Sequence, residues 1–279
     1  MTERLAVLGS PIEHSKSPQL HLAAYRVLGL DWAYERIELG VDELEGFVSG
    51  AGAGYRGFSV TMPLKAELLR LSAETDAVAR LTGAANTAIG MASGAISVFN
   101  TDVAGIVRAL EVNGLQQARH AVLLGAGATA ASALAALAEL GVETVDLRLR
   151  DPKKAGALIS LGRELGLMVL VDQLNPGLAE QRVESADVLL STLPAHVVDP
   201  WVQEYAGIAP VVLDVAYEPW PSALATANAA GTVVSGLEML LQQALIQVRI
   251  FVAGDPFAEL PDEAGVLAAM RGALDAPRD

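Results

Sequence analysis

Short apolar runs alternate with helix-like segments along almost the whole chain. In the first hundred residues the predicted elements are strands at 4–9, 32–37 and 57–61, and helices that begin at Ser17 and cover 42–48 and 64–71. Serine followed by proline is typical of a helix start. Strands that alternate with helices favour a mostly parallel sheet, so this part is predicted to form an α/β domain.

A second alternating series follows residue 102. Its predicted elements are helices at 103–112, 128–140 and 153–165 and strands at 120–124, 144–149, 168–172, 187–191, 210–214 and 232–234. Apolar strands separated by helices are typical of a sheet covered on both faces. Helices at 237–252 and 263–275 follow without another strand, so we expect them to return to the first domain. The predicted domains are therefore 1–102 plus 237–279, and 103–236.

Composition excludes several classes of function. The chain has 279 residues, 52% of them hydrophobic and 19% charged, which is typical of a globular protein. It has no cysteine, and its four histidines show no metal-ligand spacing, so neither a disulfide nor a metal site is predicted. A formal net charge of −14 argues against nucleic-acid binding, although a local basic cluster can still hold one small anion.

No membrane partner is expected. The apolar run near the N-terminus ends at Gly9, too early for a secretory signal, so we expect a cytoplasmic protein. The uncharged stretch 121–138 is long enough to span a membrane, but it consists of small residues around a glycine turn. A buried strand that runs into a buried helix explains it better.

A glycine loop lies inside the second series. The run Ala121-Val122-Leu123-Leu124 is followed by Gly125-Ala126-Gly127-Ala128-Thr129-Ala130. In such a strand, turn and helix, glycines let a pyrophosphate approach the backbone N–H groups at the helix N-terminus. The motif alone also fits an ordinary turn, but its place inside a longer alternating unit favours a dinucleotide.

Basic residues follow the next predicted strand, where the adenosine ribose of a dinucleotide would lie. They are Arg148, Arg150, Lys153 and Lys154. Guanidinium groups suit phosphate oxygens, so NADP is favoured over NAD. Asp151 could instead accept a ribose hydroxyl, and charges on a solvent-facing helix are the other interpretation.

Lys65 and Asp102 supply an ammonium and a carboxylate that could move one proton. Lys65 follows a strand end and a proline, and Asp102 directly precedes a helix, so capping of that helix is its alternative role. Ser15 and Ser17 flank Lys16 at another helix start and could bind a carboxylate, although Ser17 could equally be a helix cap. With the glycine loop, these residues indicate a dehydrogenase.

These motifs occur in an order that resembles the shikimate dehydrogenase family over nearly the whole chain. They are the run from Gly9 to Pro18, Val60-Thr61-Met62-Pro63-Leu64-Lys65, Gly83-Ala84-Ala85-Asn86-Thr87, Asn100-Thr101-Asp102, Gly125-Ala126-Gly127 and the run from Gly236 to Gln243. The resemblance implies a substrate domain joined to a Rossmann-type NADP-binding domain. It also implies a reversible, NADPH-dependent reduction of 3-dehydroshikimate to shikimate, in the pathway to chorismate and the aromatic amino acids.

The resemblance also assigns roles to residues. Lys65 and Asp102 are the expected acid/base pair at the C3 oxygen. The expected substrate residues are Ser15, Ser17, Thr61, Asn86, Tyr217 and Gln243. The expected cofactor residues are Gly125, Ala126, Gly127, Ala128, Thr129, Arg148, Arg150, Lys154, Thr192 and Gly236. The only partner expected is a small-molecule substrate, with a homodimer left open.

Several positions depart from the family pattern. Ser59 stands where asparagine is usual, Val103 where glycine is usual, and Leu149 and Asp151 flank Arg150 in place of polar residues. Three other functions stay open: a quinate/shikimate dehydrogenase that uses NAD, a non-catalytic NADP-binding module, and another dehydrogenase of this layout such as methylenetetrahydrofolate dehydrogenase.

Overall fold

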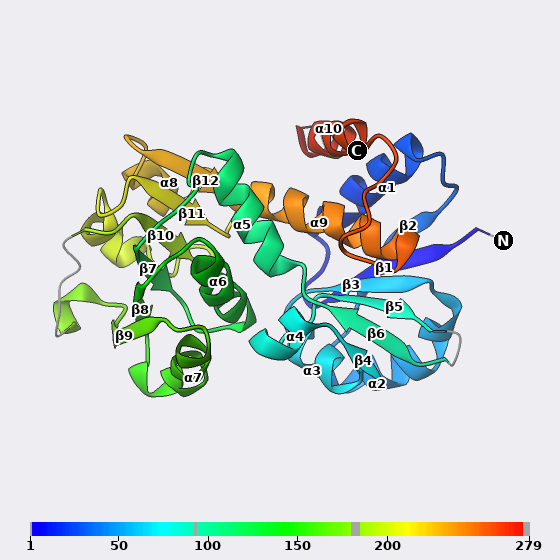
Figure 1. Cartoon of the computed structure of the whole chain (residues 1–279), viewed down its shortest axis with the longest axis horizontal. Coiled ribbons are helices and arrows are strands. Elements are labelled where there is room, and N and C mark those ends of the chain that lie inside the picture. The colour runs from blue at the N-terminus through cyan, green and yellow to red at the C-terminus, as the bar shows by residue number, and fades with distance from the viewer. Residues whose placement is uncertain (1, 92–93, 180–184, 276–279) are drawn as a thin grey trace. The chain divides into compact units, whose positions relative to one another are not determined.

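The computed structural model describes residues 2–91, 94–179 and 185–275. Within it the chain divides into two compact units, one formed by Met1–Thr101 with Leu240–Asp279 and the other by Asp102–Met239 (Figure 1). The sequence predicts that 1–102 plus 237–279 forms one domain and 103–236 the other. That these domains fold independently remains a prediction.

The first unit is built on a six-stranded sheet in the order β2-β1-β3-β5-β6-β4. Its strands are β1 (Arg4–Gly9), β2 (Ala33–Glu38), β3 (Gly57–Val60), β4 (Glu74–Thr75), β5 (Thr87–Gly90) and β6 (Ile96–Phe99). β1 pairs in parallel with β2 and β3, and β4 with β6, whereas β5 is antiparallel to both of its neighbours. The sheet is therefore mixed, with the predicted parallel strands at one side.

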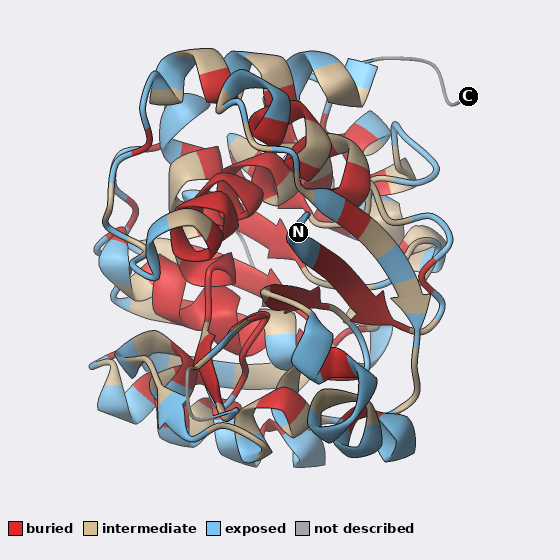
Figure 2. Ribbon diagram, turned by 90° about the vertical axis from the view of Figure 1, so that its right-hand side faces the viewer, coloured by how far each residue is buried: buried red, intermediate tan, exposed pale blue. Residues whose placement is uncertain are grey.

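Helices cover both faces of this sheet. They are α1 (Ser17–Val27), α2 (Val41–Ser49), α3 (Lys65–Arg70), α4 (Ala77–Thr82), α9 (Gly236–Ala253) and α10 (Glu263–Asp275), with a 3-10 turn η1 at Ala51–Gly54. One core packs β1 and β2 against α1, α9 and α10, and the other packs β3, β5 and β6 against α2, α3 and α4. The central strands β1 and β3 are buried along nearly their whole length, whereas the edge strand β2 is mostly exposed or half-buried (Figure 2).

The segment from β4 to β6 differs from the sequence analysis, which predicted no element between residues 72 and 102. β4 has only two residues, and β5 and β6 have four each, of which β5 (Thr-Ala-Ile-Gly) contains one large apolar residue, so the runs are too short for a clear periodic signal. This segment carries Asn86 and leads to Asp102, so the unpredicted hairpin positions two of the predicted site residues.

The second unit contains a fully parallel sheet in the order β12-β11-β10-β7-β8-β9. Its strands are β7 (His120–Leu124), β8 (Thr144–Leu149), β9 (Met168–Gln173), β10 (Val188–Ser191), β11 (Val211–Asp214) and β12 (Thr232–Ser235). The strand order reverses between β7 and β10, as in a Rossmann fold, and ligands of such sheets bind outside the carboxyl ends of the strands at that point.

Its remaining elements are α5 (Asp102–Val112), α6 (Ala128–Glu139), α7 (Gly156–Glu164), α8 (Ala223–Ala227) and the 3-10 turns η2 (Pro152–Ala155), η3 (Pro176–Leu178) and η4 (Asp199–Tyr205). On one face of the sheet η4 and α8 pack against β7, β10 and β11. α6 is buried along most of its length because alanine lets it approach its neighbours closely.

Among the described residues, one helix is long and apolar enough to cross a membrane by length and composition alone. This helix is α9, with a mean hydropathy of 1.2, and 72% of it is buried inside the structure. A core helix meets the same criteria. The stretch 121–138, considered from sequence as a spanning segment, is instead divided between β7 and α6.

Candidate active site

A cluster of buried polar side chains in the first unit joins three of the motifs. The Asn86 carboxamide donates from Nδ2 to Thr101 Oγ1 (2.9 Å) and to Gln243 Oε1 (3.2 Å). Its Oδ1 accepts the backbone N–H of Thr101 at 2.9 Å. Because a backbone N–H can only donate, this bond fixes which end of the Asn86 carboxamide is oxygen. Asn86 and Gln243, both predicted substrate residues, therefore lie side by side with defined orientations.

A second layer supports this cluster. The Thr87 hydroxyl donates to Asn86 Oδ1 at 2.9 Å, and Gln247 Nε2 donates to Thr87 Oγ1 at 3.0 Å. Thr87 and Gln247 are fully buried. The sequence analysis named Thr87 and Thr101 within motifs but gave them no role, and it missed Gln247. Gln247 lies one helical turn after Gln243, and that spacing could have indicated a shared face.

The same cluster brings the Lys65 and Asp102 segments together. The carbonyl of Lys65, the first residue of α3, accepts the N–H of Ala85 at 3.0 Å, next to Asn86. Asp102 directly follows Thr101, is the first residue of α5 and is buried. The Lys65 side chain is half-buried. Backbone hydrogen bonds thus link Lys65 to the residue before Asn86, and Asn86 to the residue before Asp102.

The loops after β1 and β3 also meet at the carboxyl ends of these strands. Ser10 donates its N–H to Met62 O at 3.0 Å, and Thr61 donates its own to Leu8 O at 2.9 Å. A Cβ at Gly9 would lie 2.5 Å from the Thr61 side chain and 2.9 Å from Met62 O, so only glycine permits this approach.

The predicted carboxylate-binding serines lie on the loop after β1. Ser17 is the first residue of α1, not its cap, and its N–H lies 3.3 Å from Ser15 Oγ. The Arg36 guanidinium donates twice to the Ser15 carbonyl, at 2.9 and 2.6 Å, and so fixes the loop. Ser17 O accepts from His21 Nδ1 at 2.8 Å.

Ser59, which departs from the family pattern, is buried and its hydroxyl is hydrogen-bonded to the Tyr34 hydroxyl. The backbone that follows is regular, because Leu64 N donates to Thr61 O at 2.9 Å ahead of α3. The smaller residue therefore has its own partner, and the turn that leads to Lys65 is intact.

In the second unit the glycine loop connects β7 to α6. Gly125 has φ +114°, a conformation that L side chains rarely adopt, and a Cβ there would lie 2.3 Å from Thr192 Oγ1. The Thr192 hydroxyl donates to Leu124 O at 2.9 Å, which ties the loop after β10 to the glycine loop. Gly127 is the N-cap of α6. Ala126, Gly127 and Ala128 are exposed, so the N–H groups of this helix end can be approached by an anion.

The basic cluster after β8 divides into two kinds of residue. Arg148 is buried, and its Nη1 lies 3.2 Å from Asp172 Oδ2. Arg150, Lys153 and Lys154 are exposed, and Asp151 accepts the N–H of Lys153 at 3.2 Å. A phosphate can therefore reach Arg150 and Lys154 directly, whereas Arg148 already has a carboxylate partner.

Tyr217 lies on the loop after β11, and Gly236 directly follows β12. Tyr217 is half-buried. Gly236, the first residue of α9, is buried, and a Cβ there would lie 2.0 Å from Val215 O. Glycine is therefore required at 236 by the neighbouring backbone, whatever role it has toward a cofactor.

Comparison with known proteins identifies the family. A family model described as the shikimate dehydrogenase substrate binding domain matches residues 7–88. The shikimate dehydrogenase (NADP(+)) of Methanothermobacter thermautotrophicus is 33% identical over 94% of this chain and 95% of its own length. That of Rubrobacter xylanophilus is 34% identical, covering 91% of this chain and 92% of its own. The chain belongs to the shikimate dehydrogenase family.

Solved structures of shikimate dehydrogenases match both units. The Mycobacterium tuberculosis enzyme superposes with a TM-score of 0.85 and 42% sequence identity, covering 97% of this chain and 99% of that one. A Thermus thermophilus shikimate 5-dehydrogenase whose structure contains NADP(H) and shikimate gives a TM-score of 0.80 at 29% identity, covering 98% and 100%. A 5-ketofructose reductase of Gluconobacter, at 23% identity and a TM-score of 0.78, shares the fold alone.

No group of three or more His, Asp or Glu side chains within the described ranges could hold a metal ion. The first unit thus holds a buried amide and hydroxyl cluster, and the second unit holds a glycine loop at the start of α6.

Proposed function

We propose that this chain catalyses the reversible reduction of 3-dehydroshikimate to shikimate with NADPH, a step toward chorismate and the aromatic amino acids. The observation that carries the proposal is the buried Asn86, Thr101 and Gln243 cluster, which joins the Lys65 and Asp102 segments. A polyhydroxylated substrate needs such oriented polar groups, because each unmatched hydroxyl leaves a buried partner unsatisfied.

The proposed proton transfer uses Lys65 and Asp102. NADPH, when bound, supplies the hydride to the C3 carbonyl carbon. The Lys65 ammonium stabilises the charge that develops on the C3 oxygen and donates a proton to it. Asp102 orients Lys65 and accepts a hydrogen bond from a neighbouring substrate hydroxyl. Thr61, Tyr217, Asn86 and Gln243 bind the other hydroxyls, and Ser15 and Ser17 bind the carboxylate.

The second unit fits NADP. The open N-terminus of α6 offers N–H groups to the pyrophosphate, and the glycine loop leaves space for its approach. We assign the 2′-phosphate to the exposed Arg150 and Lys154. Arg148 stays a predicted cofactor residue, one that would have to share its guanidinium with Asp172. Of the remaining predicted contacts, Ala126 and Thr192 lie on loops at the carboxyl edge of this sheet, and Ala128, Thr129 and Gly236 lie at the starts of α6 and α9.

A spectrophotometric assay tests the proposal, with shikimate and quinate each oxidised by NADP and by NAD. We expect shikimate with NADP to react fastest. Lys65→Ala should lower turnover about 100-fold or more while shikimate binding persists, because it removes the proton donor but leaves the amide cluster.

Two of the alternatives give different results in this assay. Faster turnover with NAD, or with quinate, would favour the NAD-dependent quinate/shikimate dehydrogenase. Binding of NADPH without any turnover would favour a non-catalytic module. Normal turnover by Lys65→Ala would remove Lys65 from the mechanism.

We further propose that the protein acts in the cytoplasm on a small molecule, with neither nucleic acid nor membrane as partner. A homodimer is the first oligomeric state to test.

A further inference from the structure

Two loops and the start of a helix lie at the carboxyl edge of the sheet in the second unit. The loops after β10 and β11 carry Thr192 and Tyr217, and Gly236 begins α9 directly after β12. Val215, at the start of the loop after β11, donates its N–H to Ser191 O at 3.0 Å, and its carbonyl packs against Gly236. The loop after β11 is therefore held at its beginning between the end of β10 and the start of α9.

One carboxylate connects this edge. Asp214, the last residue of β11, accepts the Ser222 hydroxyl at 2.7 Å through Oδ2 and the N–H of Ala216 at 3.2 Å through Oδ1. It also accepts a hydrogen bond from the Ser191 side chain, next to Thr192. Ser222 in turn caps α8 by accepting the N–H of Ala225 at 3.0 Å. The Asp214–Ser222 bond thus closes residues 215–221 into a loop anchored at both ends.

Asp214 is only 2% exposed, and among the described residues no cation forms an ion pair with it. Burial raises the pKa of the Asp214 carboxyl. The hydrogen bonds from Ser222, Ala216 and Ser191 lower this pKa and offset part of the rise. Burying a carboxylate without a cation costs free energy, so packing alone does not explain an aspartate at this position. What the carboxylate provides here is several acceptor positions that neutral side chains do not match.

We propose that Asp214 is a positioning residue that sets the place of Tyr217 by closing the 215–221 loop onto Ser222. The inference rests on the proposed function, in which Tyr217 binds a substrate hydroxyl. It assigns no contact with substrate to Asp214 itself. Removal of the closure should weaken substrate binding through Tyr217, while the reaction at the C3 oxygen, which Lys65 serves, should change little.

Two variants open the closure in different ways. Ser222→Asp still caps α8 but cannot donate to Asp214, and Asp214→Asn keeps the shape but presents an NH₂ group in place of one acceptor. For both we expect the KM for shikimate to rise about 10-fold, with kcat and the KM for NADP within about threefold of the parent. Ser222→Thr keeps the hydroxyl and should restore the parental KM. Thr226→Ala, which removes an exposed hydroxyl of α8 that bonds only Ser222 O, is the matched control.

The Tyr217→Phe background separates positioning from general damage. If Asp214 acts through the Tyr217 hydroxyl, Ser222→Asp should add no further rise in KM once that hydroxyl is gone. An equal rise in both backgrounds would overturn the proposal.

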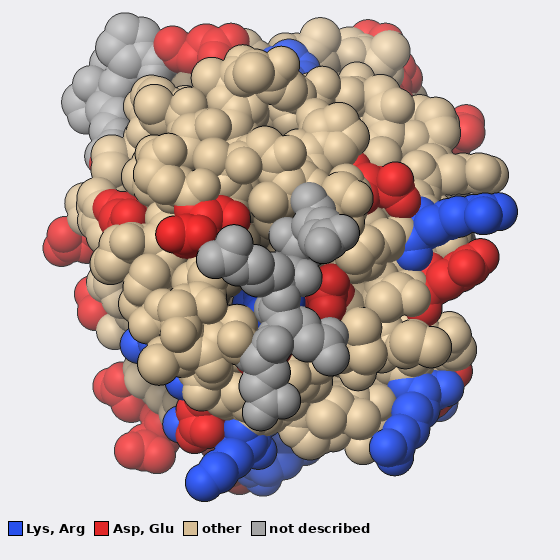
Figure 3. All heavy atoms as spheres, turned by 90° about the vertical axis from the view of Figure 1, so that its left-hand side faces the viewer, with Lys and Arg blue, Asp and Glu red and all other residues tan. Residues whose placement is uncertain are grey.

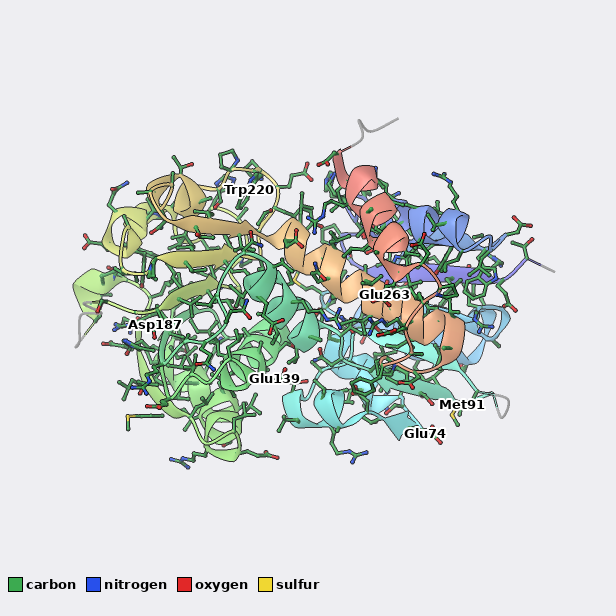
Figure 4. The ribbon with its side chains drawn as sticks, turned by 45° about the horizontal axis from the view of Figure 1, so that its top comes forward. Glu74, Met91, Glu139, Asp187, Trp220 and Glu263 are labelled. Atoms are coloured by element: carbon green, nitrogen blue, oxygen red, sulfur yellow. The ribbon has the colours of Figure 1, made fainter. Side chains whose placement is uncertain are left out.

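A readout without substrate keeps the inference separate from the proposed function. Trp220 lies in the same loop and is 39% exposed (Figure 4). Acrylamide quenching of the Trp220 part of the fluorescence, obtained by difference from Trp220→Phe, should increase in Ser222→Asp and Asp214→Asn. Unchanged quenching would contradict the closure even if the chain oxidised shikimate, and increased quenching would support it even if shikimate were not the substrate.

Discussion

The orientation of Asn86 follows from one backbone hydrogen bond. Because the Thr101 N–H must donate, Asn86 Oδ1 must face it, and the Thr87 hydroxyl can then only donate to the same oxygen. Gln247 must therefore offer its NH₂ group to Thr87. The sequence shows which residues can form hydrogen bonds, but only the fold shows which backbone group each one meets. The motifs that contain Asn86, Thr87 and Thr101 were predictable, whereas the hydrogen bonds among them and the part of Gln247 were not.

The residues of the basic cluster should differ in what their removal does. Arg150 is exposed, so Arg150→Ala should raise the KM for NADP about 10-fold and leave the KM for NAD and the unfolding temperature unchanged. Arg148→Ala leaves Asp172 without its partner at 3.2 Å and should lower the unfolding temperature. Steady-state kinetics with both cofactors and a thermal melt measure the two effects. A KM for NADP unmoved in Arg150→Ala would reject the phosphate assignment.

At the scale of elements, the long alternating segments were predictable from their periodicity and the short ones were not. Each strand of the second unit was predicted close to its observed position, since short runs rich in Val and Leu in an alternating α/β series leave little choice. β5 and β6 were missed because Thr87, Ala88, Ser97 and the glycines around them carry no strong alternation. Their antiparallel pairing is decided by neighbours far away in the chain, among them β3.

The turn between β7 and α6 gives a test at this scale. Gly125→Ala places a Cβ 2.3 Å from Thr192 Oγ1 on a backbone with φ +114°, so it should cost about 1–3 kcal/mol of stability and displace the loop after β10. Gly127→Ala is the matched control in the same loop, because a Cβ there meets nothing within 4 Å. Urea denaturation measures the difference. Equal free energies of unfolding would show that the loop relaxes around the added methyl group.

For the whole molecule, the excess of acidic residues bears on how it responds to pH. The formal net charge is −14, and Figure 3 shows acidic side chains scattered over one face, with basic ones gathered toward its lower edge. A partly buried ion pair such as that of Arg249 with Glu263 (labelled in Figure 4), which ties α9 to the start of α10, loses its attraction when the carboxylate is protonated. Acid should therefore destabilise the protein through carboxylates, and one histidine adds a separate contribution.

That histidine is His21, fully buried on α1. Its ring stacks on Tyr34 with centroids 4.1 Å apart, and Nδ1 lies 2.8 Å from Ser17 O. Burial lowers the pKa of His21 to about 4 from the ordinary 6.5. Between pH 6.5 and 4 the unfolded chain binds a proton at His21, but the folded protein keeps this ring neutral. The contribution of His21 to the free energy of unfolding is therefore fully present above pH 6.5 and is lost as the pH falls toward 4.

The loss attributable to His21 should approach about 3 kcal/mol across this window. His21→Gln, which cannot titrate, should be less stable at pH 7 because it loses the ring stack, but should lose less of its stability between pH 6.5 and 4. His196→Gln is the control, since His196 is exposed on its loop and lies 2.8 Å from Asp199. Urea denaturation of the three proteins at several pH values measures the slopes. If His21→Gln keeps the full acid dependence of the parent, the proton is taken up elsewhere, and the carboxylates alone account for the acid sensitivity of the fold.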